Sequence, residues 1–156
     1  MTSKILLDAN LSILLAVGLT KREYIAEHKR LTKYDATDLD ILSRLIDQSS
    51  GVIFTPNTLT ETSNLARYIP EPARTEIAAT LAWLIDRAEE RVVASGRAVL
   101  RPEYLKLGLT DAVLLEALHT GTILVTDDLD LYLAASMTGM SVVNFNHLRD
   151  QRPDFR

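Results

Sequence analysis

The stretch Lys4-Ile5-Leu6-Leu7-Asp8-Ala9-Asn10 places an acid directly after a short apolar run. A run of this length suits a buried strand. The same pattern predicts strands at 52–54, 123–125 and 141–144, and residues 92–94 are a further candidate for a short edge strand. Helical patterns separate these runs. Strands that alternate with helices imply a parallel sheet with helices on both faces, so we predict an α/β fold.

The helices are expected between the strands, with polar residues and prolines at their starts. Asn10 and Ser12 are candidate caps for a helix over 11–17 that Gly18 would end. Residues 20–33 suit a helix or an ordered loop, and 102–107 suit one or two helical turns. Further helices are expected at 38–48, 55–67, 70–90, 110–121 and 128–138.

Length and composition favour one globular domain over 1–156, with 147–156 as a loosely held polar tail. Apolar residues make up 47% and charged residues 24% of the chain, which excludes a disordered protein. There is no cysteine, which excludes disulfides and thiolate metal sites and is compatible with the cytoplasm. No apolar stretch suits a signal peptide or a membrane span, so we expect a cytoplasmic protein.

The net charge of −4 argues against a protein that coats nucleic acid non-specifically. If four acids were neutralised by metal ions, however, the remaining 17 acids would equal the 17 basic residues. The acidic total therefore leaves room for a phosphodiester substrate.

Four acids have positions that suggest a shared site. Asp8 follows the first strand, Glu61 lies in the helix after the second, and Asp128 follows the strand at 123–125. These three belong to the same edge of a parallel sheet, where the carboxyl ends of the strands meet. Asp111 opens the helix before that strand, so the strand pattern leaves its position open.

Clustered carboxylates repel one another, and a hard cation removes the repulsion. Ligands that are oxygen only suit Mg²⁺ or Mn²⁺, which can polarise a phosphoryl oxygen and orient an attacking water. His28, His119 and His147 are scattered, and none is placed beside these acids.

Each acid also has a purely structural interpretation. Asp8 and Asp128 can cap the helices that follow them. Glu61 matches a capping box with Thr58, and Asp111 in a first helical turn is favoured by the helix dipole. Taken singly, these positions leave both interpretations open.

Four motifs together resemble those of PIN-domain proteins, in the order of that family and from Ile5 to Phe145. They are Leu7-Asp8-Ala9-Asn10, Pro56-Asn57-Thr58-Leu59-Thr60-Glu61, Leu109-Thr110-Asp111-Ala112 and Val125-Thr126-Asp127-Asp128-Leu129-Asp130. The resemblance implies a single domain with a parallel sheet of about five strands.

The resemblance also implies one or two Mg²⁺ or Mn²⁺ ions held by the four acids Asp8, Glu61, Asp111 and Asp128 as metal ligands and catalytic groups. It selects Asp128 rather than Asp127, as the third residue of a Thr-x-Asp motif. Asn10 and Thr126 match the polar positions that flank such sites, and Asp130 matches a frequent additional acid.

Two features depart from the family pattern. Ala9 stands where a hydroxylated residue is common, and residues 19–37 form an elaboration with five basic residues: Lys21, Arg22, Lys29, Arg30 and Lys33. This run suits contacts with phosphates, although a solvated basic helix face is the more frequent role of such a run.

The resemblance implies a metal-dependent ribonuclease that cleaves phosphodiester bonds in RNA, with the toxin of a toxin–antitoxin pair as one role. An antitoxin and a second copy of the chain are then candidate partners. The main alternative is a PIN-like module that binds nucleic acid or protein without catalysis. A phosphotransfer or receiver-like domain ranks lowest, because Asn10 stands where the former needs an acid and no lysine accompanies the last strand.

Overall fold

The computed structural model describes residues 3–154. Within this range, five parallel strands form one sheet in the order β3-β2-β1-β4-β5. The strands are β1 (Lys4–Leu7), β2 (Val52–Phe54), β3 (Glu89–Glu90), β4 (Thr122–Thr126) and β5 (Ser141–Asn144). The predicted α/β class, with a parallel sheet flanked by helices in a single domain, is confirmed.

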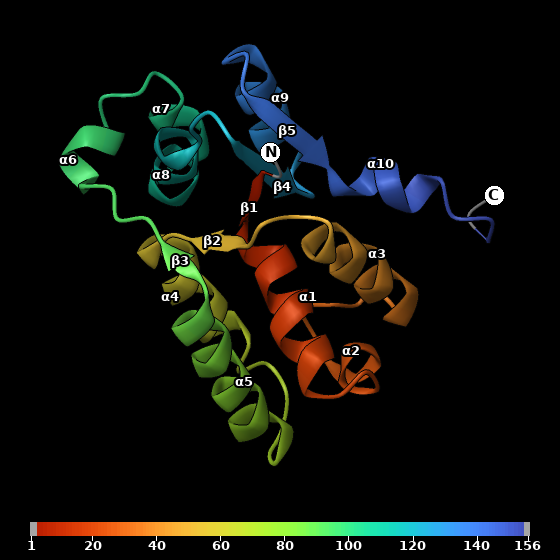
Figure 1. Cartoon of the computed structure of the whole chain (residues 1–156). Coiled ribbons are helices and arrows are strands. Elements are labelled where there is room, and N and C mark those ends of the chain that lie inside the picture. The colour runs from red at the N-terminus through yellow and green to blue at the C-terminus, as the bar shows by residue number, and fades with distance from the viewer. Residues whose placement is uncertain (1–2, 155–156) are drawn as a thin grey trace.

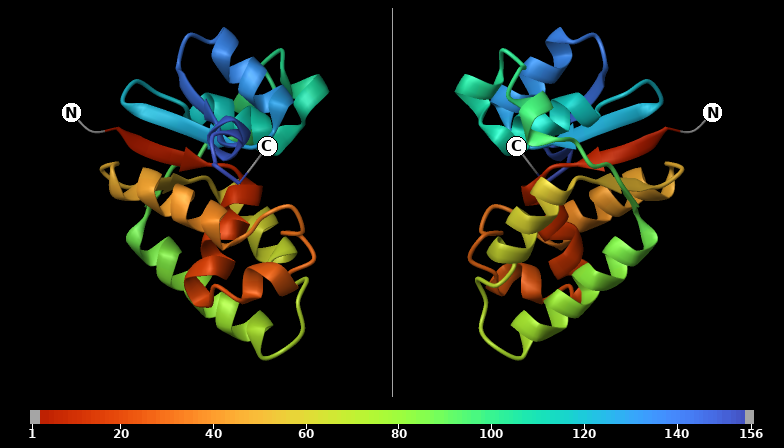
Figure 2. Two further views of the ribbon diagram at one scale, coloured as in Figure 1. Left: turned by 90° about the vertical axis from the view of Figure 1, so that its right-hand side faces the viewer. Right: turned by 90° about the vertical axis from the view of Figure 1, so that its left-hand side faces the viewer.

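Helices connect the strands and cover both faces of the sheet (Figures 1 and 2). They are α1 (Ala9–Thr20), α2 (Tyr24–Glu27), α3 (Ala36–Asp47), α4 (Pro56–Leu65), α5 (Ala73–Arg87), α6 (Ser95–Ala98), α7 (Tyr104–Leu107), α8 (Leu109–Ala117), α9 (Leu129–Met137) and α10 (Phe145–Asp150). No helix within residues 3–154 is long and apolar enough to cross a membrane.

Alternate residues of the strands feed two separate cores, because successive side chains of a strand point to opposite faces. Ile5 and Leu7 pack with the leucines of α1 and α3 and with α5. Leu6 lies on the other face and packs with buried residues of α8 and α9. The central strands β1, β2 and β4 are therefore largely buried on both sides, which explains why they are apolar runs rather than alternating patterns.

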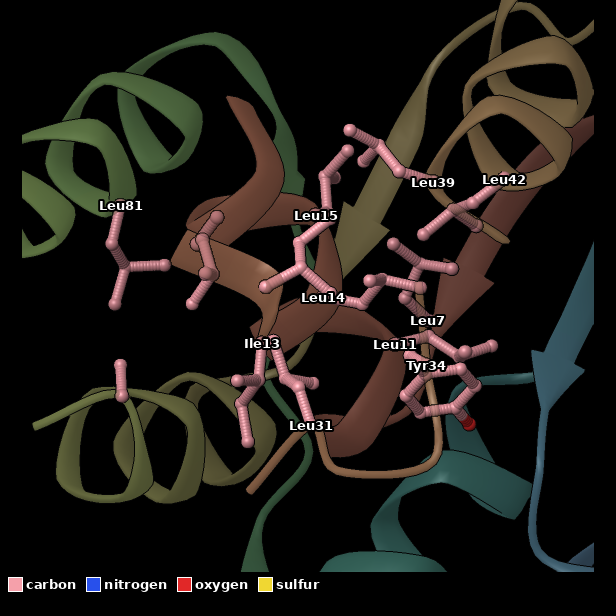
Figure 3. Packing of buried hydrophobic residues seen from close by; sticks show 14 of the residues in the cluster. Leu7, Leu11, Ile13, Leu14, Leu15, Leu31, Tyr34, Leu39, Leu42 and Leu81 are labelled. Atoms are coloured by element: carbon pink, nitrogen blue, oxygen red, sulfur yellow. The ribbon is translucent and has the colours of Figure 1, made fainter. Parts of the chain in front are cut away.

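Helix α1 lies at the centre of the larger core (Figure 3). Every residue from Leu11 to Gly18 is buried, so the helix is apolar all round and fixes the end of β1 in place. The helix does not end at Gly18 as predicted. A Cβ built on Gly18 would lie 2.7 Å from both terminal methyl carbons of Leu39, so this glycine allows α1 and α3 to pack closely.

Two expected elements differ from the structure. The edge strand expected at 92–94 lies earlier, at Glu89–Glu90, where it pairs with Ile53 and Phe54. The tail is also more firmly held than expected. As far as Asp154, the tail contains most of helix α10 and the buried Arg152. The guanidinium of Arg152 lies 2.8 Å from the carboxylate of Asp35 and 2.9 Å from that of Asp38. Residues 155–156 lie outside the described range.

Candidate active site

The strand order places a topological switch point between β1 and β4. The chain leaves β1 toward β2 on one side of the sheet, whereas β4 lies directly on the other side of β1. In open α/β sheets, sites form outside the carboxyl ends of the strands at such a point. Asp8 follows β1 and Asp128 follows β4, so both predicted acids lie at this crevice.

Asp8 is a buried carboxylate that joins the two central strands. Its Oδ1 accepts a hydrogen bond from the backbone of Leu11 at 3.0 Å, which caps α1. Its Oδ2 accepts from the hydroxyl of Thr126 and, at 3.2 Å, from the backbone of Asp127. Of the caps that the sequence offered for the first helix, Asp8 is therefore confirmed, and Asn10 and Ser12 are not the cap, because Asp8 is the residue at which the strand turns into the helix.

The environment of Asp8 disfavours its charged form. Burial raises the pKa of its carboxyl to about 7, with a further contribution from the charge of Asp127, although hydrogen bonds from Thr126 and two backbone groups oppose the shift. A buried acid with a strongly raised pKa is a frequent feature of functional sites.

Asp127, which the sequence motif passed over, is the second buried carboxylate of this edge. It accepts hydrogen bonds from Asn10 at 3.2 Å and from the hydroxyl of Tyr34, and Lys33 lies 2.9 Å away. Burial raises the pKa of Asp127, but the bonds from Tyr34 and Lys33 outweigh this effect and hold the pKa below its usual range. Asp127 thus carries the negative charge of this buried pair, and Asp8 is its proton-accepting member.

Asp111 lies close to two other predicted acids. It is half-buried in the first turn of α8, and its pKa is raised to about 6 by burial and then by the charges of Asp128 and Glu61. The sequence left the position of Asp111 open, and the fold brings the start of α8 to the carboxyl edge. Three of the four predicted acids therefore influence one another electrostatically.

Glu61 is not part of a capping box. The cap of α4 is Thr55, whose hydroxyl accepts from the backbone of Thr58 at 3.1 Å. Glu61 therefore lies in the second turn, exposed on the wall of a groove that Thr110 also lines. Its carboxylate is free of the structural role that the sequence offered for it.

The remaining predicted residues divide into two groups. Thr126 links Asp8 to Asp128, since its hydroxyl donates to Asp8 and accepts from the backbone of Asp128 at 3.0 Å. Asn10 contacts Asp127 instead of the four predicted acids. Asp130 is exposed at the start of α9, and its carboxylate lies 3.9 Å from the ammonium of Lys106.

The oxygen ligands at this edge fit a hard divalent cation, although the carboxylates are not spaced as they would be around a bound ion. All the acids offer oxygen ligands, and the repulsion that raises the pKa of Asp111 is what a cation would relieve. Within residues 3–154, however, no group of three or more acidic or histidine side chains already has the arrangement to hold a metal ion. Asp128 is also engaged as the cap of α9, through its contact with Leu131 at 3.0 Å. Binding an ion here therefore requires side chains to rotate.

One signal in the sequence does point to Asp127. Two successive acids follow β4, and only one of them is needed to cap α9. The partners Lys33 and Tyr34 are more than 90 residues away in the chain, so no local pattern connects them to Asp127.

Comparison with known proteins adds little to this picture. No family model matches the chain, and no curated protein matches it. Among solved structures, the chain is similar to a domain of a functionally unknown protein from Methanocaldococcus jannaschii DSM 2661, with 17% identity and a TM-score of 0.47. The similarity covers 90% of this chain and 89% of that chain. We draw no functional conclusion from a similarity at this level.

Proposed function

We propose that this protein is a metal-dependent ribonuclease of the PIN-domain type. The observation that supports the proposal is the meeting of Asp111, Asp128 and Glu61 at the carboxyl edge of the sheet, with Asp8 linked to Asp128 through Thr126. These are the four positions that the resemblance to PIN-domain proteins selects. The cysteine-free sequence suits the reducing cytoplasm, where we expect the protein to act.

In this proposal the residues of the chain have distinct roles. Asp111 and Asp128 would hold Mg²⁺ or Mn²⁺ together with Asp8, and the exposed Glu61 would orient the ion or a water at the rim. A divalent cation in such a site polarises the phosphoryl oxygen and lowers the pKa of a bound water. Thr126 would keep the Asp8 carboxylate oriented, because its hydroxyl already fixes Oδ2.

The role as toxin of a toxin–antitoxin pair, and an antitoxin or a second copy as partner, stay predictions of the resemblance. A toxin would use the same four acids for cleavage, and neither partner would change the chemistry of the site.

A PIN-like binding module without catalysis is the second candidate. One observation favours it: Asp8 and Asp128 both serve as helix caps, and no metal arrangement is already formed within residues 3–154. In that case the acids stabilise the fold, and cleavage is absent at every metal concentration.

Cleavage assays separate the two candidates. Labelled RNAs of mixed structure and a single-stranded DNA are incubated with purified protein in Mg²⁺, Mn²⁺ or EDTA. We expect RNA cleavage that requires metal and falls about 100-fold or more in Asp8→Asn and in Asp111→Asn, since several kcal/mol of transition-state stabilisation depend on the ion. Asp86→Asn, at an acid that is 83% exposed on α5, serves as the matched control and should cleave normally.

The binding module would give a different result. The wild-type protein would then cleave none of the RNAs in either metal, and Asp8→Asn would differ from it only in stability. Circular dichroism of each variant ensures that a loss of cleavage is not a loss of fold.

A further inference from the structure

A basic platform lies beside the candidate active site. It consists of five residues from two loops and the start of α5: Lys29, Arg30, Arg67, Tyr68 and Arg74. These residues are far apart in the chain, yet the two loops are joined by hydrogen bonds. The backbone of Lys29 donates to the carbonyl oxygen of Tyr68 at 3.3 Å, and the buried ring of His28 contacts the carbonyl oxygen of Ala66 at 3.0 Å.

The platform is held in a defined shape. Arg74 donates from Nε to the carbonyl oxygens of Arg67 and Ile69, each at 3.2 Å, and so fixes the loop after α4. The guanidinium of Arg30 lies 6.0 Å from the centre of the Tyr68 ring. This ring is 49% exposed, which leaves much of it open to a ligand.

Two adjoining grooves lie between the platform and Glu61. One groove, of about 690 Å³, is lined by Glu61, Thr110, Asn64 and Arg30. A second groove, of about 630 Å³, is lined by Asn64, Tyr68 and the basic residues of the loop. Asn64 lines both grooves, which therefore adjoin there and give a shared path from the platform across α4 toward Glu61. In Figure 2 the strands point toward the side of the molecule on which the end of α4 lies.

The charge of the platform is available to a ligand. Lys29, Arg30 and Arg67 form no ion pair within residues 3–154, whereas most other basic side chains of the chain contact an acid. One acid, Glu71, is nearby; its carboxylate accepts hydrogen bonds from Thr75, and the charges of Arg74 and Arg67 also help to lower its pKa. The balance remains positive in a chain whose net charge is −4.

We propose that the basic platform binds single-stranded RNA, with phosphates on Lys29, Arg30 and Arg67 and an unpaired base stacked on Tyr68. This inference rests on the proposed ribonuclease function, and it deepens it by naming the form of the substrate. Basic side chains contact phosphates, while an exposed aromatic ring can stack only on a base that is free of a duplex. The strand then continues along the shared path toward Glu61 and Asp111.

The test measures RNA binding in EDTA, where metal-dependent cleavage cannot occur. Fluorescence anisotropy compares a labelled single strand with a hairpin of equal length. We expect tighter binding of the single strand, and a loss of about tenfold in affinity in Tyr68→Ala, because stacking on one aromatic ring commonly contributes this much. Tyr68→Phe keeps the ring and should bind within about twofold of wild type.

Salt dependence tests the phosphate contacts. In Arg67→Ala, the slope of log affinity against log salt should fall by about 0.7, the value for one phosphate contact on a single strand. Arg87→Ala is the matched control: Arg87 also lies over an exposed aromatic ring, 4.1 Å from the centre of Trp83, but at the end of α5 that leads into β3. Its affinity and slope should equal those of wild type.

Three results would contradict the proposal that the platform binds single-stranded RNA. They are no binding of the single strand, equal binding of the hairpin, and unchanged affinity in Tyr68→Ala and Arg67→Ala. Failure of the ribonuclease proposal looks different. In that case the wild-type protein cleaves no RNA when metal is restored, even though the platform variants still show their losses in binding.

Discussion

Two buried carboxylates of the sheet edge, Asp8 and Asp127, differ because their partners differ. Asp127 is met by the charge of Lys33 and the hydroxyl of Tyr34, which favour its charged form. Asp8 has neutral partners and faces the charge of Asp127, so burial decides its pKa. The fold thus places an anion deep in the edge, at Asp127.

Asp111 provides a pH-dependent test at this scale. In EDTA, well below the ordinary pKa of 3.8, its carboxyl is protonated in both folded and unfolded chains. As the pH rises through about 6, the unfolded carboxyl ionises first, so wild type loses stability relative to Asp111→Asn, whose side chain cannot ionise. The difference in the free energy of unfolding between the two proteins should therefore grow over this range and then level off.

Urea denaturation at a series of pH values measures that difference. Asp86→Asn, at an exposed acid, is the control and should show a flat difference. A flat difference for Asp111→Asn as well would mean that neither burial nor the charges of Asp128 and Glu61 raise the pKa of Asp111.

At the residue scale, the sequence predicted the helix caps only in part. The cap at Asp8 follows from its place between a strand and a helix, and it is confirmed. Glu61 matched a capping box only because Thr58 lies three residues before it; the helix starts earlier, after Thr55, so that box does not form. The charge of Asp127 depends on contacts across the fold, which a local pattern cannot show.

At the scale of elements, α10 is attached to α3 by charged side chains. Asp38 is fully buried and is contacted by Arg149 at 3.0 Å and by Arg152 at 2.9 Å. It also completes a capping box with Asp35 at the start of α3. The tail therefore becomes part of the domain through these ion pairs in addition to Phe145 and Leu148 of α10, which pack on the larger core. Its polar composition alone predicted a loose segment.

Substitution of Asp38 tests this attachment. Asp38→Ala removes the buried carboxylate that Arg149 and Arg152 share. It should lower the free energy of unfolding by about 3 kcal/mol, the lower end for a broken buried ion pair, because Asp35 and Asp154 still contact Arg152. Asp40→Ala is the control on the same helix. Asp40 forms an exposed pair with Arg22, so its loss should change stability by less than about 1 kcal/mol.

Chemical denaturation gives both values, and proteolysis adds a second measure. The tail of Asp38→Ala should be cut faster than that of Asp40→Ala. Equal stability of the two variants would show that the tail is held by other contacts.

At the scale of the whole molecule, the strand order explains why residues from four parts of the chain meet. The switch point between β1 and β4 places Asp8 beside Thr126, and the helices that follow β2 and precede β4 bring Glu61 and Asp111 to the same edge. The class of fold and the strands at 4–7, 52–54 and 141–144 could be predicted, because apolar runs between helical patterns are local. The position of β3 and the position of Asp111 at the sheet edge could not be predicted, because both depend on packing between distant elements.

The central claim is that these acids form a site for a divalent cation, and calorimetric titration of Mn²⁺ tests it most directly. EDTA-treated, dialysed protein is titrated at a pH about one unit above the pKa of Asp8, which is the higher of the two raised values, so that the carboxyls of both Asp8 and Asp111 can ionise. We predict saturable binding by wild type and Asp86→Asn, together with a rise in melting temperature. Binding should be lost in Asp8→Asn and in Asp111→Asn. An absence of binding to wild type, or equal binding by Asp111→Asn, would contradict the claim.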